Sequence, residues 1–127
     1  GEHLTCNQVL YHLEERSIEH GVLSWCQAHS VALVGYSPFG SGHFPSSRSA
    51  GGRVLGAIAE AHGATPYQVA LAFLTRERQT FAIPKAASVA HAEDNAAGGA
   101  LALSAADLAQ IDAAFPLGRP RRSLPTI

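Results

Sequence analysis

A lysine, a histidine and an amide lie within eleven residues of one another, as Lys85, His91 and Asn95. Lys85 ends a short apolar run, and its bare ammonium suits a phosphate group. His91 adds positive charge only when it is protonated, which ties its contribution to pH. We expect these three residues to share one strand-to-helix corner. The alternative for Lys85 is an ordinary solvated lysine at a strand end.

Glycines and serines are frequent between Pro38 and Gly52, a segment that breaks the helical and strand patterns around it. Gly40 and Gly42 flank Ser41, and glycines let backbone N–H groups come close to phosphate oxygens. The segment is therefore predicted to be a long loop. Its composition fits a flexible linker equally well.

Two further candidates lie at predicted strand ends. Gln8 offers both a donor and an acceptor to an amide group. The alternative for Gln8 is a side chain that satisfies a loop backbone. Tyr36 ends the next strand, where by itself it is read as a core aromatic.

Three stretches rich in β-branched and aromatic residues alternate with stretches of helical periodicity. The predicted strands are Leu4 to Val9, Val31 to Tyr36 and Thr80 to Pro84. Such alternation is typical of consecutive βα units on a parallel sheet. A helix with Ser17 as its cap is expected between the first two strands, with its Trp25 face packed on the sheet.

Four more helices are predicted from capping residues and apolar periodicity. They run from Arg53 to Gly63, from Pro66 through Leu74, from Ser88 to about Ala97, and from Ser104 to Pro116. Thr65 with Gln68 and Ser104 with Asp107 form capping boxes. Gly98 and Gly99 are expected to end the third of these helices. The tail, residues 117–127, is expected to be flexible and unstructured.

Composition limits the class of protein. The 127 residues are 46% hydrophobic and only 15% charged, which suits one domain with some apolar surface meant to be covered. A net charge of −1 without a basic run argues against nucleic-acid binding, and no stretch is apolar enough to span a membrane. We expect a cytoplasmic protein in which Cys6 and Cys26 are reduced core residues. The chain starts at Gly1 and has no methionine, so upstream sequence is expected.

Several motifs occur in a recognisable order. They are Asn7-Gln8-Val9 with Tyr11-His12, Tyr36-Ser37-Pro38-Phe39-Gly40, Ile83-Pro84-Lys85 with Asn95 ten residues later, and Leu103-Ser104. In these motifs the whole chain resembles the C-terminal part of the aldo-keto reductases, most of all bacterial reductases of methylglyoxal and related small aldehydes. The resemblance implies an α/β fold, a partial (β/α)₈ TIM barrel with its sixth to eighth βα units and the C-terminal helix.

The resemblance also implies a cofactor, NADPH, and a role for each matching residue. Gln8 would hold the nicotinamide carboxamide and Tyr36 would stack on the nicotinamide ring. Ser37, Phe39 and Ser41 would approach the pyrophosphate, with residues 38–52 as a cofactor-covering loop. The other end of the cofactor would meet Lys85 at the 2′-phosphate and Asp94 and Asn95 at the adenine. For Asp94, a solvated helix face is the alternative.

Two departures from the family pattern bear on this assignment. The family often has serine or threonine directly after the lysine and arginine six residues after it, where this chain has Ala86 and His91. The arginine clamp on the 2′-phosphate is therefore weaker, and NADH is not excluded.

The catalytic groups of the family are not found in this chain. Its proton-donating tyrosine and the lysine, aspartate and histidine around it belong to earlier strands, and Tyr11, Tyr36 and Tyr67 do not occupy their positions. No histidine or cysteine pair has the spacing of a zinc site, although a cluster of His3, Cys6 and His12 is a remote alternative. We therefore expect no catalytic residue and no metal.

The sequence leads to one main hypothesis and two alternatives. The chain is predicted to be a fragment of an NADPH-dependent aldo-keto reductase that reduces small carbonyl substrates, and it is expected to be inactive by itself. One alternative is a non-catalytic nucleotide-binding module, and the other is a structural relic that associates with itself and binds nothing. Because three strands cannot close a barrel of eight, the open sheet is expected to pair with another copy, as a homodimer or larger homo-oligomer.

Overall fold

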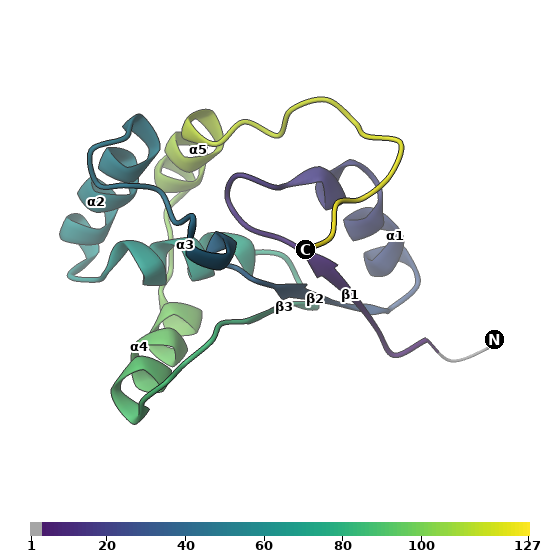
Figure 1. The fold of residues 1–127 in the computed structure, drawn as a ribbon, viewed down its shortest axis with the longest axis horizontal. Helices are drawn as coiled ribbons and strands as arrows, with labels where there is room; N and C mark the ends of the chain where they lie inside the picture. The colour runs from purple at the N-terminus through teal and green to yellow at the C-terminus, as the bar shows by residue number, and fades with distance from the viewer. Residues whose placement is uncertain (1–3) are drawn as a thin grey trace.

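The computed structural model describes residues 4–127 and contains a three-stranded parallel sheet with helices packed on it (Figure 1). The strands are β1 (Cys6–Leu10), β2 (Ala32–Tyr36) and β3 (Thr80–Ile83). β2 lies in the centre, and both of its pairings are parallel. The prediction of three parallel strands is confirmed, although β1 begins and ends later than expected. Gln8 therefore lies within β1 and not at its end.

The helices account for most of the remaining chain. They are the 3₁₀ turns η1 (Ser17–His20) and η2 (Gly40–Gly42), and the α-helices α1 (Val22–Ala28), α2 (Ala50–His62), α3 (Pro66–Leu74), α4 (Val89–Ala100) and α5 (Ala105–Ala114). Both predicted capping boxes form, at Thr65 with Gln68 and at Ser104 with Asp107. Ser88 caps α4 as predicted. Gly63 ends α2 in the left-handed conformation (φ 60°) that glycine tolerates best.

One face of the sheet is covered and the other is open. Val9, Leu33 and Thr80 are buried beneath helices, where α1 packs on β2 and α3 packs on β3. Residues that pair in a parallel register point to the same face, so Gln8, Val34 and Phe81 form one row of the opposite face, and Tyr36 and Ile83 belong to the next row. Phe81 is 56% exposed and Ile83 is 48% exposed. This open face is the apolar surface that the low charged fraction suggested.

Two expected core residues are exposed. Trp25 was expected to pack on the sheet, but it is 47% exposed and stacks on His29, with ring centroids 4.2 Å apart. The reason is that Gly21 separates η1 from α1 and changes which side chains face inward. Leu23 and Cys26 fill the core instead. Cys6 is also exposed, so only one of the two cysteines is a core residue.

Two glycines, Gly52 and Gly98, permit close packing where the sequence predicted a loop or a helix end. A Cβ at Gly52 would lie 1.8 Å from the Ser46 carbonyl oxygen. Gly52 therefore belongs to the first turn of α2, which Ser49 caps, and the loop ends earlier than predicted. A Cβ at Gly98 would lie 3.1 Å from Gln68 Cα, so this glycine lets α4 approach α3 and does not end α4.

A buried polar network joins β1, η1 and the end of α3. Glu19 accepts hydrogen bonds from Tyr11 (2.6 Å), from Arg16 (2.8 and 2.7 Å) and from Arg76 (3.1 Å). The guanidinium groups of Arg16 and Arg76 also lie over the ring of Phe73, 5.1 and 4.0 Å from its centroid. The network therefore holds α3 in place relative to the sheet.

The tail has no helix or strand, as predicted, but it contacts the rest of the chain. His20 lies 3.1 Å from the Gly118 carbonyl oxygen, and Arg121 forms an ion pair with Glu15 at 3.3 Å. In Figure 1 it returns from α5 over α1 towards β1. Among residues 4–127, no helix is both long and apolar enough to cross a membrane.

Candidate nucleotide site

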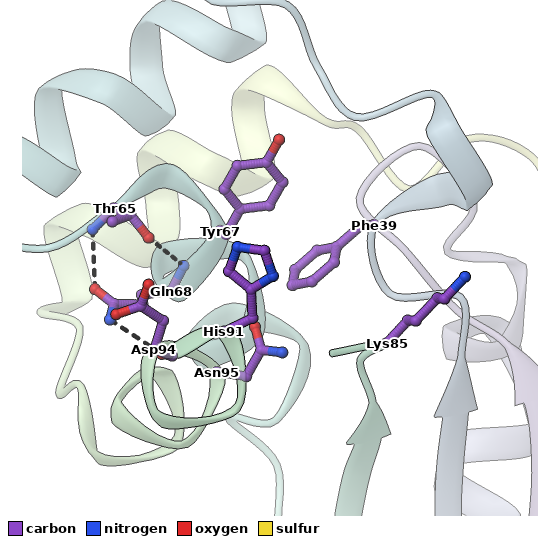
Figure 2. A pocket seen from close by; sticks show the side chains of 8 residues that line it. All are labelled: Phe39, Thr65, Tyr67, Gln68, Lys85, His91, Asp94 and Asn95. Carbon is purple, nitrogen blue, oxygen red and sulfur yellow. Dashed lines mark hydrogen bonds between the residues drawn. The ribbon is translucent and has the colours of Figure 1, made fainter. Parts of the chain in front are cut away.

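The corner between β3 and α4 brings together four of the residues that the sequence singled out. Ser88 caps α4 by accepting a hydrogen bond from the His91 backbone N–H (3.2 Å). His91, Asp94 and Asn95 then follow at i, i+3 and i+4, which places them on one face of the helix. With Lys85, which follows β3, they border a cavity of about 410 Å³ (Figure 2). The predicted strand-to-helix corner is therefore present as a cavity.

The other wall of this cavity comes from the loop after β2 and from the start of α3. The complete lining is Phe39, Thr65, Tyr67, Gln68, Lys85, His91, Asp94 and Asn95. Figure 2 shows Tyr67 above His91, Phe39 to the right of it, and Thr65 and Gln68 to the left. The cavity therefore joins aromatic rings to a set of charged, imidazole and amide groups.

Sequence reasoning missed Thr65, Tyr67 and Gln68 as site residues. Thr65 and Gln68 were recognised only as a capping box, and that box forms, with the Thr65 N–H donating to Gln68 Oε1 (3.0 Å). Gln68 has a second role, because its Nε2 donates to the Asp94 carbonyl oxygen (3.0 Å) and links α3 to α4. The capping motif fixes the start of α3 but carries no signal that α4 packs against it.

The backbone after β2 has an unusual conformation. Ser37, Gly40, Ser41 and Gly42 all have positive φ, from 51° to 95°, and Ser41 Oγ donates to Ser37 Oγ (3.0 Å). Phe39 is close to the right-handed region (φ −102°, ψ 15°) and Gly40 is left-handed (φ 71°). Successive residues of this kind can turn neighbouring N–H groups towards one anion. Strained serines at such a turn are typical of functional sites.

Four predicted site residues do not line the corner cavity: Gln8, Tyr36, Ser37 and Ser41. Tyr36 ends β2, and Gln8 lies in β1 one row further down the open face. Ser37 and Ser41 border the turn between the open face and the cavity. The predicted residues thus fall into two groups, one that lines the corner cavity and one on the open face and the turn after β2. Phe39 belongs to this turn and also lines the cavity.

The charges around the corner are mixed. Lys85, His91 and Asp94 are all exposed, and no carboxylate of residues 4–127 forms an ion pair with Lys85. Next to the loop after β2, burial lowers the pKa of His12, although the charges of nearby Glu15 and Glu14 oppose this shift. No cluster of three His, Cys, Asp or Glu residues in the described part of the chain could hold a metal ion. The proposed alternative cluster includes His3, which lies outside that part.

Known proteins resemble this chain in both amino-acid sequence and fold. The model of the Aldo/keto reductase family matches residues 3–115. Over 124 residues the chain is 38% identical to methylglyoxal reductase YeaE of Escherichia coli (strain K12), an alignment that covers 98% of this chain and 44% of that protein. The chain therefore spans less than half the length of this relative.

Solved structures agree with this comparison. An aldo/keto reductase from Klebsiella pneumoniae in complex with NADP and acetate matches with a TM-score of 0.87 and 38% identity, over 99% of this chain and 44% of that one. The thermostable aldo-keto reductase Tm1743 in complex with epalrestat matches with a TM-score of 0.78 and 37% identity, over 86% and 39%. The three strands and their helices are thus part of a TIM barrel, and the chain belongs to the aldo/keto reductase family.

Proposed function

We propose that residues 1–127 are the C-terminal, cofactor-binding part of an NADPH-dependent aldo-keto reductase whose whole form reduces aldehydes or ketones to alcohols. The observation that carries this proposal is the corner cavity, which gathers Lys85, His91, Asp94 and Asn95. A relative of 38% identity has been crystallised with NADP. The similarity to a methylglyoxal reductase favours a small carbonyl substrate. The cytoplasm remains the expected location from composition.

The chemistry of the lining residues fits the adenosine end of the cofactor. The Lys85 ammonium suits the 2′-phosphate, and the Asp94 carboxylate and the Asn95 amide can bond the edge of adenine. The turn at Ser37, Phe39 and Ser41 would present backbone N–H groups to the pyrophosphate. The loop from Pro38 onwards would then cover the cofactor, as the sequence suggested.

The nicotinamide end would lie on the open face of the sheet. Gln8 would bond the carboxamide and Tyr36 would pack on the ring, so that one face of the ring is turned to the substrate. Bound NADPH supplies a hydride to the carbonyl carbon of the substrate. In the proposed whole enzyme, earlier strands cover this face and provide the proton donor.

A second candidate function is a nucleotide-binding module without chemistry. The cavity favours it, because it brings Lys85, His91 and Asn95 together at one corner. A structural relic that binds nothing is the third candidate. Nucleotide titration separates these two candidates from each other.

We predict weak binding of 2′,5′-ADP, with little binding of 5′-AMP, because only the first ligand carries the 2′-phosphate that Lys85 and His91 would meet. Isothermal titration calorimetry measures both affinities.

The variant Lys85→Ala is expected to remove the preference for 2′,5′-ADP, because it lacks the ammonium that would meet the 2′-phosphate. Equal binding of the two ligands by the unmodified chain would contradict a 2′-phosphate site at this corner.

We also propose that the isolated chain associates with itself. The open sheet face exposes Phe81 and Ile83, and both sheet edges offer unpaired backbone groups. Light scattering after gel filtration should report a mass of about twice that of one chain at micromolar concentration. A monodisperse species with the 13.3 kDa mass of one chain would contradict this proposal.

A further inference from the structure

A partly buried histidine, His12, lies next to the loop that follows β2. Its backbone pairs with Glu15 in an antiparallel bridge, with N···O distances of 3.3 and 2.9 Å. The preceding residue, Tyr11, donates its backbone N–H to the Tyr36 carbonyl oxygen at the end of β2 (3.3 Å). These backbone hydrogen bonds fix the place of His12 relative to the sheet.

The loop after β2 packs directly on the His12 ring. A Cβ on Gly40 would lie 3.7 Å from His12 Nδ1 and 3.8 Å from both His12 Cε1 and His43 Cβ. Both histidines line a space of about 10 Å³, which loop residues on either side of the turn, Pro38 and Pro45, also border. A space of this volume is at the lower limit for one water molecule. A charged imidazole in the closed loop would therefore gain little hydration.

The turn in this loop is held by few contacts of its own. The Gly40 N–H donates to the Ser37 carbonyl oxygen (2.9 Å), and the His43 N–H donates to the Gly40 carbonyl oxygen (3.2 Å). Phe39 and Phe44 meet edge to face, with ring centroids 5.9 Å apart. Ser37 has a positive φ of 51°, which is unfavourable for a residue other than glycine. The turn therefore depends on the surface on which it packs, which includes the His12 ring.

The groups around His12 favour its neutral form. Burial is the main cause of a pKa below the usual value of about 6.5, although the charges of Glu15 and Glu14 oppose this shift. Glu15 is also engaged by the tail, since it forms an ion pair with Arg121 at 3.3 Å. On the loop side, a charge on His43 disfavours a second charge on His12.

We propose that the loop after β2 is closed on neutral His12 and opens when His12 is protonated. Protonation places a cation between two chain segments with little water, and the cost falls if the turn moves away. Because the closed state binds the proton less tightly than the open state, closure is strongest above the open-state pKa and weakens as the pH falls towards the closed-state pKa. An effect on pyrophosphate binding rests on the proposed function, but the opening itself requires no ligand.

The test measures hydrogen exchange of the Gly40 and His43 amides by NMR from about pH 7.5 to about pH 5.5, with each rate divided by the intrinsic rate at that pH. Protection of both amides should fall several-fold over this range, by at most about tenfold per pH unit. The fall should follow the titration of the His12 ring in the same sample. The Leu33 amide, which donates to the Gln79 carbonyl oxygen within the sheet (2.8 Å), should stay protected.

Two substitutions remove the titration and keep part of the side chain. His12→Phe keeps a flat ring and His12→Gln keeps a polar group, and both should abolish the pH dependence of protection. His20→Gln is the matched control and should keep it, because His20 is exposed and lies at the Gly118 carbonyl oxygen of the tail, away from the loop. A variant that loses protection at Leu33 has not folded, and the other variant then decides. If neither variant folds, the shared midpoint of His12 titration and loss of protection in the unmodified chain decides.

The inference and the proposed function can fail separately. Constant protection of the Gly40 and His43 amides in the unmodified chain would overturn the inference. A fall in protection that persists in both His12→Phe and His12→Gln would also overturn it, because another group would then be responsible. Neither result bears on the binding of 2′,5′-ADP, and failure of that binding would leave the pH-dependent loop in place.

Discussion

Purified as it stands, this chain is expected to reduce neither methylglyoxal nor nitrobenzaldehyde with NADPH above background. The family resemblance assigns the proton donor and its lysine, aspartate and histidine neighbours to strands before β1. Loss of a positioned general acid alone costs on the order of 10²- to 10⁴-fold in rate. Loss of the strands that orient the substrate adds to this cost.

We do not expect Tyr11 to replace that donor. Tyr11 is 2% exposed, and its hydroxyl donates to Glu19 (2.6 Å) and accepts from Arg76 (3.1 Å). Burial is the main cause of a pKa well above the usual value of tyrosine, and Glu19 raises it further while Arg76 opposes the shift. A buried phenol with this pKa is a poor proton donor to an external carbonyl.

Activity is measured by loss of NADPH absorbance, with a full-length bacterial aldo-keto reductase as positive control. The chain is passed through two unlike chromatographic steps, so that a contaminating reductase separates from it. Saturable turnover that follows the chain through both steps would show that it contains a catalytic site of its own.

Local sequence signals predicted much of this fold because they act through neighbouring residues. The Thr65 and Ser104 capping boxes satisfy helix N–H groups within one turn, so their geometry needs no tertiary partner. The corner of Lys85, His91 and Asn95 was also predictable, since a strand end followed by a capped helix fixes where these side chains can lie.

Signals that depend on packing between distant segments were misread. Gly98 reads as a helix stop, but it is required where α4 approaches Gln68, 30 residues earlier in the chain. Trp25 has the spacing of a core residue, yet the break at Gly21 turns it outward. Tyr67 borders the cavity because of the path that the loop after β2 takes. That loop has no helical or strand periodicity from which its path could be predicted.

The polar network around Glu19 is another feature without a local signal, and it stabilises the fold. The side chains of Glu19 and Arg16 are 9% and 3% exposed. Burial acts to raise the pKa of Glu19, but hydrogen bonds from Arg16 and Tyr11 and the charge of Arg76 lower it below its usual value. A lowered pKa means that the folded state favours the ionised carboxylate, so its contribution to stability is present above the unfolded-state pKa.

Replacing Glu19 with alanine is expected to lower the free energy of unfolding by about 3 kcal/mol, because Arg16 and Arg76 lose their shared carboxylate. The cost is at the low end for a buried pair, since Arg16 keeps Asp112 (2.7 Å) and the Phe115 carbonyl oxygen. Glu60→Ala, at an exposed position of α2, is the matched control and should change stability by less than about 0.5 kcal/mol.

The pH dependence of Glu19→Gln distinguishes charge from packing, because glutamine keeps the shape of the side chain and lacks the carboxylate. Urea unfolding near neutral pH should find the unmodified chain more stable than this variant. As the pH falls through the folded-state pKa of Glu19, below the usual value of about 4.3, the carboxyl is protonated and the difference should disappear. A difference that stays constant down to about pH 3 would show that the network stabilises the fold through packing and neutral hydrogen bonds.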